Sequence, residues 1–141
     1  MLRYNKDKIS KLIFEMRKAI SRLDSISEID KEEFLKNQDK IDSAKYNFII
    51  AIESAIDICN HLISQNGFRP PQDYADTFVV LAEQGILEDE FVNNLKNMVK
   101  FRNRLVHIYW EINNKQIYMI LKNNIRDLKK LLNRIIEILE T

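Results

Sequence analysis

The sequence predicts an all-α protein built as an up-and-down bundle of helices. Glycine and proline occur only twice each in 141 residues, whereas a turn-rich β fold uses many of both. The hydrophobic fraction of 45% and the charged fraction of 30% suit long amphipathic helices. The length allows one domain with a sizeable core and is short for two, so we expect a single domain over residues 1–141.

Three helices are expected in the first half of the chain. Apolar side chains at helical spacing predict an amphipathic helix from about Lys6 to Ile26. Ser27 to Asp30 offers side chains that accept hydrogen bonds from unpaired amides, which predicts a break before a short helix through Phe34 and Leu35. Residues 41–65 are apolar around much of the helical circumference and predict a central helix packed on several sides.

Three more helices are expected in the second half. Gly67 predicts the end of the central helix, and Asp73 or Asp76 can cap a short helix that Gly85 ends. Two longer helices are predicted over residues 88–106 and 117–139, with a loop at 113–115 between them.

The net charge and the single cysteine limit the binding partners and the cellular compartment that we expect for this protein. A net charge of +1 provides no global attraction to polyanions, so any such binding needs a local patch. Cys59 is the only cysteine and resembles a small core residue. The N-terminus lacks an apolar signal segment, and no run approaches the roughly 18 apolar residues of a membrane span. We expect a cytoplasmic protein that does not enter a membrane.

The segment from Arg102 to Tyr109 carries the most chemical information. Arg102 interrupts the apolar stripe of its predicted helix, and a buried guanidinium must find a carboxylate, a phosphate or a partner chain. The stripe comprises Phe91, Leu95, Met98, Arg102, Leu105, Val106 and Tyr109. The opposite face carries Lys96, Lys100, Asn103, Arg104 and His107. The lysines and Arg104 could hold RNA phosphates, although a solvated basic face is the commoner explanation of such a row.

Arg102 and His107 lie five positions apart, which places them about 140° apart around a regular helix. Either the helix loosens after Arg102, or one site is assembled from two copies of the chain. We expect both to act together in a homodimer, with the apolar stripe forming the contact between copies.

A histidine beside an arginine can cleave RNA without a bound metal. The imidazole of His107 can take a proton from a ribose 2′-hydroxyl or give one to the leaving 5′-oxygen, while Arg102 stabilises the phosphate. No cluster of His, Cys or carboxylates has the spacing of a metal site, so neither a metal nor a cofactor is expected. His61, beside apolar Leu62 and Ile63, is interpreted as structural.

Glu53 and Asp57 lie one helical turn apart on the central helix, where like charges repel. An arginine between them would remove this repulsion. They either support Arg102 or Arg104, or form an exposed acidic strip, and the sequence leaves both interpretations open.

The pattern of Arg102, His107 and Tyr109 resembles the R-xxxx-H-x-Y signature of HepT-type HEPN-domain toxins, with the polar Asn103 following the arginine. The resemblance extends over residues 46–63, 67–74, 78–87 and 117–121, and so over the chain from about Asp42 onward.

This resemblance implies a HEPN-type helical bundle that dimerises with its signatures close together. It implies an endoribonuclease toxin of a type VII-like HEPN/MNT toxin–antitoxin pair, in which an MNT-type nucleotidyltransferase antitoxin uses ATP to transfer AMP to a tyrosine. By position, His107 would be the general acid or base, Arg102 would bind phosphate, Asn103 would support the site and Tyr109 would be modified. Two alternatives remain: a non-catalytic nucleotide-binding subunit of a two-component nucleotidyltransferase, and a purely structural helical dimer.

Overall fold

The computed structural model describes residues 1–140, which are helical throughout apart from short connections and contain no strand. This confirms the predicted all-α class. The elements are α1 (Lys6–Ser27), α2 (Lys31–Lys36), α3 (Gln38–Gln65), α4 (Tyr74–Glu83), α5 (Asp89–His107), the 3₁₀ turn η1 (Tyr109–Glu111), α6 (Asn114–Asn123) and α7 (Ile125–Glu140).

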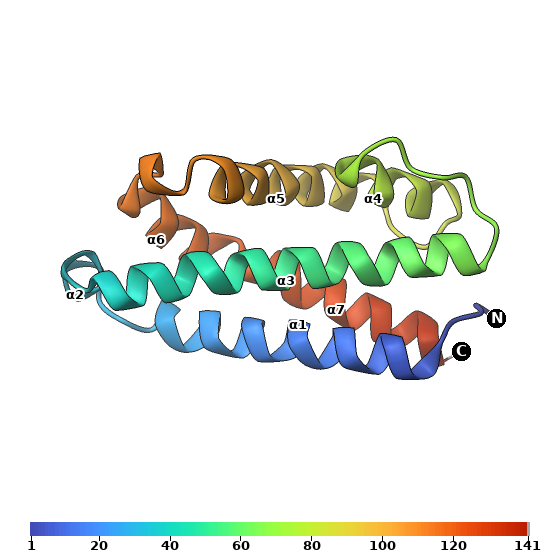
Figure 1. The fold of residues 1–141 in the computed structure, drawn as a ribbon, viewed down its shortest axis with the longest axis horizontal. Helices are drawn as coiled ribbons and strands as arrows, with labels where there is room; N and C mark the ends of the chain where they lie inside the picture. The colour runs from blue at the N-terminus through green and yellow to red at the C-terminus, as the bar shows by residue number, and fades with distance from the viewer. Residues whose placement is uncertain (141) are drawn as a thin grey trace.

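The helices form an elongated bundle around α3 (Figure 1). Helix α1 runs along one side of α3, while α4 and α5 follow one another along the other side. Helices α6 and α7 return behind α3 and contact α1. The N- and C-terminal ends lie at one end of the bundle, and α2 lies at the opposite end.

Polar caps and two glycines set the helix boundaries. The side chains of Asn5, Asn37 and Asp73 accept hydrogen bonds from the backbone amides of the first turns of α1, α3 and α4. Thus Asp73 rather than Asp76 is the cap of α4, and α3, capped by Asn37, begins at Gln38, three residues before the predicted position. Gly67 and Gly85 have φ values of +66° and +73°, so each provides the left-handed residue that ends a helix, as predicted.

Helix α3 contributes to the core along its whole length. Phe48 packs edge-on against Phe101 of α5, with ring centroids 5.2 Å apart. Cys59 is fully buried, as expected of a small core residue. His61 is buried and its Nε2 accepts a hydrogen bond from the backbone N of Asn5 at 2.9 Å, so it has the structural role that the sequence predicts.

The prediction of one final helix over residues 117–139 is wrong. Two helices, α6 and α7, are separated at Asn124, and α6 already begins at Asn114, inside the predicted loop. Asn113 caps α6 by accepting from the N–H of Lys115 at 2.8 Å. The Asn124 side chain donates to Asp127 at 3.5 Å, and asparagine favours such local hydrogen bonds over the helical interior. The apolar pattern continues across this break and conceals it.

The predicted dimer contact through the apolar stripe of α5 is also wrong. Phe91, Leu95, Met98 and Leu105 are each at most 5% exposed within a single chain. They face the chain's own core, because α5 packs against both α3 and α4. A surface already covered within one chain cannot mediate contact with a second copy.

Leu95→Ala should therefore destabilise the single chain rather than only separate two chains. Removing a fully buried leucine side chain costs roughly 2–5 kcal/mol of unfolding free energy. Met119→Ala, at a position that is 58% exposed, should stay within about 0.5 kcal/mol of wild type. Urea denaturation followed by circular dichroism measures both, and equal stabilities of the two variants would contradict the burial of the stripe.

Candidate functional site

Helix α5 keeps regular geometry through the whole interval from Arg102 to His107. The backbone N–H of Ile108 donates to the carbonyl of Arg104 at 2.9 Å, and the helix ends only at Ile108, where φ is −135°. The helix does not loosen after Arg102, so that part of the expectation is wrong. Within one chain the two side chains diverge by about 140° around the axis.

Arg102 points from α5 toward α3 and is 14% exposed. Its Nη2 and Nε donate to Oε1 of Glu53 at 2.6 and 3.2 Å. Its Nη1 donates to Oδ1 of Asn103 at 3.0 Å, and its guanidinium carbon lies 5.2 Å from the centre of the Tyr74 ring. Of the partners that the sequence left open for this arginine, the structure provides a carboxylate, that of Glu53, and the guanidinium is held from three sides.

Asp57 lies one turn beyond Glu53 and lines the same cavity of about 200 Å³, together with Ile56, Tyr74 and Arg102. Partial desolvation, and then the charge of Glu53, raises the pKa of Asp57, while Lys8 and Arg102 oppose this shift. Asp57 makes no hydrogen bond to Arg102 within residues 1–140, so its influence on the arginine is electrostatic.

Tyr109 begins η1 and turns back onto the start of α3. Its hydroxyl donates to Oδ1 of Asp42 at 2.9 Å. The buried Lys45 donates from Nζ to the Tyr109 carbonyl at 3.0 Å and lies 4.4 Å from the centre of its ring. Burial first, and then the hydrogen bond and charge of Asp42, raises the pKa of Tyr109 to about 12.

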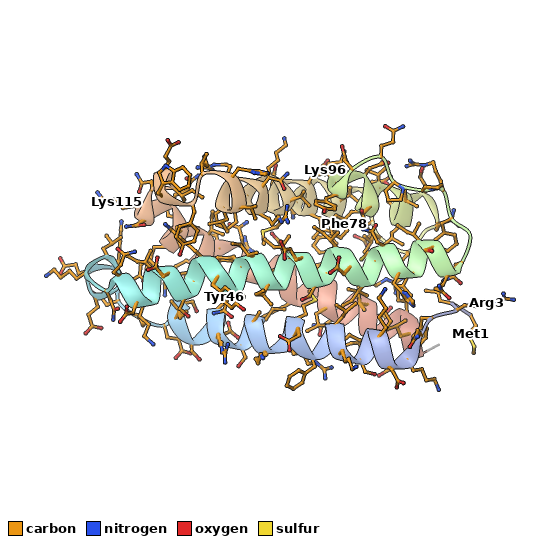
Figure 2. The ribbon with its side chains drawn as sticks, in the orientation of Figure 1. Met1, Arg3, Tyr46, Phe78, Lys96 and Lys115 are labelled. Atoms are coloured by element: carbon orange, nitrogen blue, oxygen red, sulfur yellow. The ribbon has the colours of Figure 1, made fainter. Side chains whose placement is uncertain are left out.

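His107 is exposed and makes no side-chain hydrogen bond to any other residue of the described range 1–140. It shares its face of α5 with Lys100 and Arg104, which line a cavity of about 190 Å³ between α5 and α6. Arg104 donates to Oε1 of Gln116 at 3.0 Å. Lys96 lies on the outer edge of the bundle (Figure 2). The hydrogen bonds from Arg69 and from the Gln72 backbone lower the pKa of Asp76, and the charge of Lys96 makes a lesser contribution in the same direction.

The signature side chains thus point in different directions. Arg102 and Tyr109 both contact α3, through Glu53 and Asp42, which are eleven residues apart and therefore about 16 Å apart along one face of that helix. His107 points away from α3. Exposed apolar side chains lie on the α3–α5 face, with Tyr46 57% exposed and Val106 42% exposed.

Three residues that contact Tyr109 or Arg102 are absent from the sequence-based prediction, namely Asp42, Lys45 and Tyr74. Asp42 and Glu53 share one face of α3, and that spacing is a signal that sequence reasoning could have used. Lys45 and Tyr74 offer no comparable signal, because only the packing of η1 and α4 brings them to Tyr109 and Arg102.

Among residues 1–140, no three His, Cys, Asp or Glu side chains are grouped so that they could bind a metal ion. In the same range, no helix is both long enough and apolar enough to traverse a lipid bilayer.

The structure is similar to those of HEPN toxins, which gives the class of this protein. The structure matches that of the tri-AMPylated Shewanella oneidensis HEPN toxin in complex with MNT antitoxin, with a TM-score of 0.83 and 29% identity, over 92% of this chain and 96% of that one. A toxin–antitoxin structure with AMP-PNP gives a TM-score of 0.82 and 28% identity, over 92% and 98% of the two chains.

Residues 16–135 match the family model described as Ribonuclease HepT-like. The mRNA nuclease HepT of Shewanella oneidensis is 29% identical over 127 residues, which cover 90% of this chain and 95% of that protein. The chain belongs to the HepT-like ribonuclease family. This confirms the resemblance stated from the sequence and the expectation of a ribonuclease of this family.

The contact between Tyr109 and Asp42 predicts a specific loss of stability in alkaline solution. The folded-state pKa of about 12 exceeds the ordinary value of 10.0, so the unfolded chain releases this proton first. The stability that the neutral phenol provides is complete below pH 10 and is lost as the pH rises through about 12. The thermal unfolding midpoint of wild type should therefore fall more steeply from pH 10 to 12 than that of Tyr109→Phe. Parallel dependence of the two midpoints on pH would contradict the contact.

Proposed function

We propose that this chain is a metal-independent endoribonuclease toxin in which Arg102 holds the RNA phosphate and His107 transfers protons. The observation that carries the proposal is the contrast between these two side chains. Arg102 is nearly buried and fixed by neighbours, while His107 is exposed and makes no side-chain hydrogen bond within residues 1–140. Such a pair suits a fixed phosphate clamp and an accessible proton carrier.

The contacts of Arg102 favour a phosphate clamp over a purely structural ion pair. A guanidinium has five N–H donors, and Glu53 and Asn103 use three of them. One donor remains on each Nη, and two such donors can bind a phosphate in a bidentate manner. Glu53 and Asn103 act as supports in this proposal, because they fix the plane of the guanidinium before RNA arrives. Asp57 supports it through its charge at the same cavity.

The divergence of Arg102 and His107 leads us to propose a homodimer as the active form. One chain cannot direct both side chains at one phosphodiester, whereas two copies related by a two-fold axis can place His107 of one near Arg102 of the other. The contact would use exposed apolar side chains, Tyr46 and Val106 with Tyr74 beside them, in place of the buried members of the α5 stripe.

Binding of the RNA strand would extend along the outer face of α5. Lys96, Lys100 and Arg104 follow one another at one-turn spacing on the face that also carries His107. Phosphate contacts from this row would give affinity that weakens with salt and little sequence preference.

Control of the activity would come from a nucleotidyltransferase of the MNT type that uses ATP to transfer AMP to Tyr109. The related Shewanella oneidensis toxin is tri-AMPylated and bound to MNT antitoxin, which supports this proposal. Each AMP unit adds a phosphodiester charge and bulk two residues from His107, and so would repel and obstruct RNA.

His107→Ala should lower RNA cleavage by about a hundredfold or more, since general acid–base catalysis contributes at least that much. Wild-type cleavage should persist in EDTA and leave 2′,3′-cyclic phosphate ends. Asn94→Ala, a change at another exposed position of α5, serves as the control and should cleave like wild type. Retained activity of His107→Ala would instead favour a non-catalytic nucleotide-binding subunit.

Val106→Arg should convert the protein to monomers and abolish cleavage without unfolding it, because a charge at the centre of the proposed contact cannot be desolvated without a partner. Met119→Arg places the same charge at an exposed apolar position on α6 and should remain dimeric and active. Light scattering at micromolar concentration measures the assembly. A wild-type monomer that cleaves RNA would rule out the shared site.

Tyr109→Phe should still cleave RNA but escape neutralisation by an MNT antitoxin and ATP, because it keeps the ring and lacks only the acceptor oxygen. Intact-mass analysis and peptide mapping of the modified wild type should place AMP on this residue. Added mass on Tyr118, whose hydroxyl donates to the Ile29 carbonyl at 2.8 Å, would assign the modification elsewhere.

A further inference from the structure

The Tyr109 hydroxyl donates a hydrogen bond to Asp42, a carboxylate that belongs neither to the proposed RNA cleavage site nor to the R-xxxx-H-x-Y signature. Oδ1 of Asp42 accepts this hydroxyl at 2.9 Å and also accepts Nε2 of Gln38 at 3.0 Å. Asp42 is half-buried in the first turns of α3, sixty-seven residues from Tyr109 in sequence. The pair exists only because η1 folds back onto α3.

Transfer of AMP to a phenol requires that the phenolic proton leave. The tyrosine oxygen forms a bond to the α-phosphorus of ATP, the bond from that phosphorus to the β-phosphate bridging oxygen breaks, and pyrophosphate departs with the electron pair. With the pKa of Tyr109 raised to about 12, almost no phenolate exists at neutral pH. The proton must therefore move to a nearby acceptor as the new bond forms.

We propose that Asp42 is this acceptor and takes the Tyr109 proton on Oδ1 during AMP transfer. The inference rests on the proposed function, in that it requires Tyr109 to be the modified residue. Oδ1 already lies at hydrogen-bond distance from the proton that must leave. Protonation also neutralises Asp42 at the moment when the negatively charged phosphodiester forms beside it. The half-buried carboxyl then returns the proton to solvent.

Lys45 is the positioning residue in this arrangement. Its ammonium contacts both the carbonyl and the ring face of Tyr109, which fixes the side chain with the hydroxyl on Asp42. Lys45 is only 4% exposed, so its role is to hold η1 against α3 rather than to meet the nucleotide.

Asp42→Asn isolates the proton transfer, because the amide oxygen can still accept from both Tyr109 and Gln38 but cannot take a proton at neutral pH. The experiment incubates the full chain with an MNT antitoxin that labels wild type from radiolabelled ATP, and measures the single-turnover rate at saturating antitoxin and ATP. We expect the rate to fall by about a hundredfold or more, with unchanged antitoxin affinity and unchanged RNA cleavage. Asp39→Asn, the same change one turn earlier at an exposed position, should react like wild type.

A second variant separates proton transfer from positioning. Replacement of Tyr109 by a fluorinated tyrosine with a more acidic phenol should restore much of the rate in the Asp42→Asn background, since such a phenol needs less help from a base. A lack of rescue would show that Asp42 only positions the ring and would overturn the inference. An Asp42→Asn variant that receives AMP at the wild-type rate would also overturn the inference, because the base would then have to come from the antitoxin. If wild type acquires AMP at another residue, the proposed modification of Tyr109 itself fails.

Discussion

The ion pair between Arg102 of α5 and Glu53 of α3 is the interaction on which the functional geometry depends. A guanidinium in an apolar helix face needs a partner that compensates its charge, and the Glu53 carboxylate provides one at 2.6 Å. Because Glu53 is 39% exposed, water screens the pair, and its main effect is orientation rather than stability. The pair fixes the direction of the Arg102 side chain, while the burial of Phe91, Leu95, Met98 and Leu105 fixes the rotation of α5 that turns His107 outward.

A second contact, between η1 and the start of α3, completes this arrangement. Tyr109 is held by Asp42 and Lys45 about three helical turns from the Glu53 contact. Between the two anchors α5 remains a regular helix, so His107 is forced outward. In the proposed function, this regular geometry would keep one chain from directing both residues at one phosphodiester, which is why we propose a homodimer as the active form.

The contacts around Arg102 and those around Tyr109 differ in the hydrogen-bonding groups that they leave available to a ligand. Around Arg102, the contacts with Glu53 and Asn103 leave donors for an anion. Around Tyr109, the hydroxyl is engaged by a carboxylate and the ring by an ammonium, an arrangement that favours a neutral phenol. Cleavage and its control would thus depend on one short segment, the end of α5 and the start of η1, and on a single face of α3. In the proposed function, a modification of Tyr109 would lie two residues from His107, on a side chain separate from the proposed Arg102 clamp.

The sequence by itself determined the helical class, most helix boundaries, the helix ends at Gly67 and Gly85, and the residue types of the site, because these depend on local periodicity and on side-chain chemistry. It also required that Arg102 find a carboxylate, a phosphate or a partner chain. It could not reveal the break at Asn124, because the apolar pattern continues across it. It could not reveal that the α5 stripe is buried within one chain either, since an apolar helix face has the same sequence pattern whether it packs on α3 or on a second copy. Asp42 and Lys45 meet Tyr109 across more than sixty residues. Such contacts are decided only by tertiary packing, because hydrogen bonds between distant segments depend on how the helices are placed and leave no periodic trace in the chain.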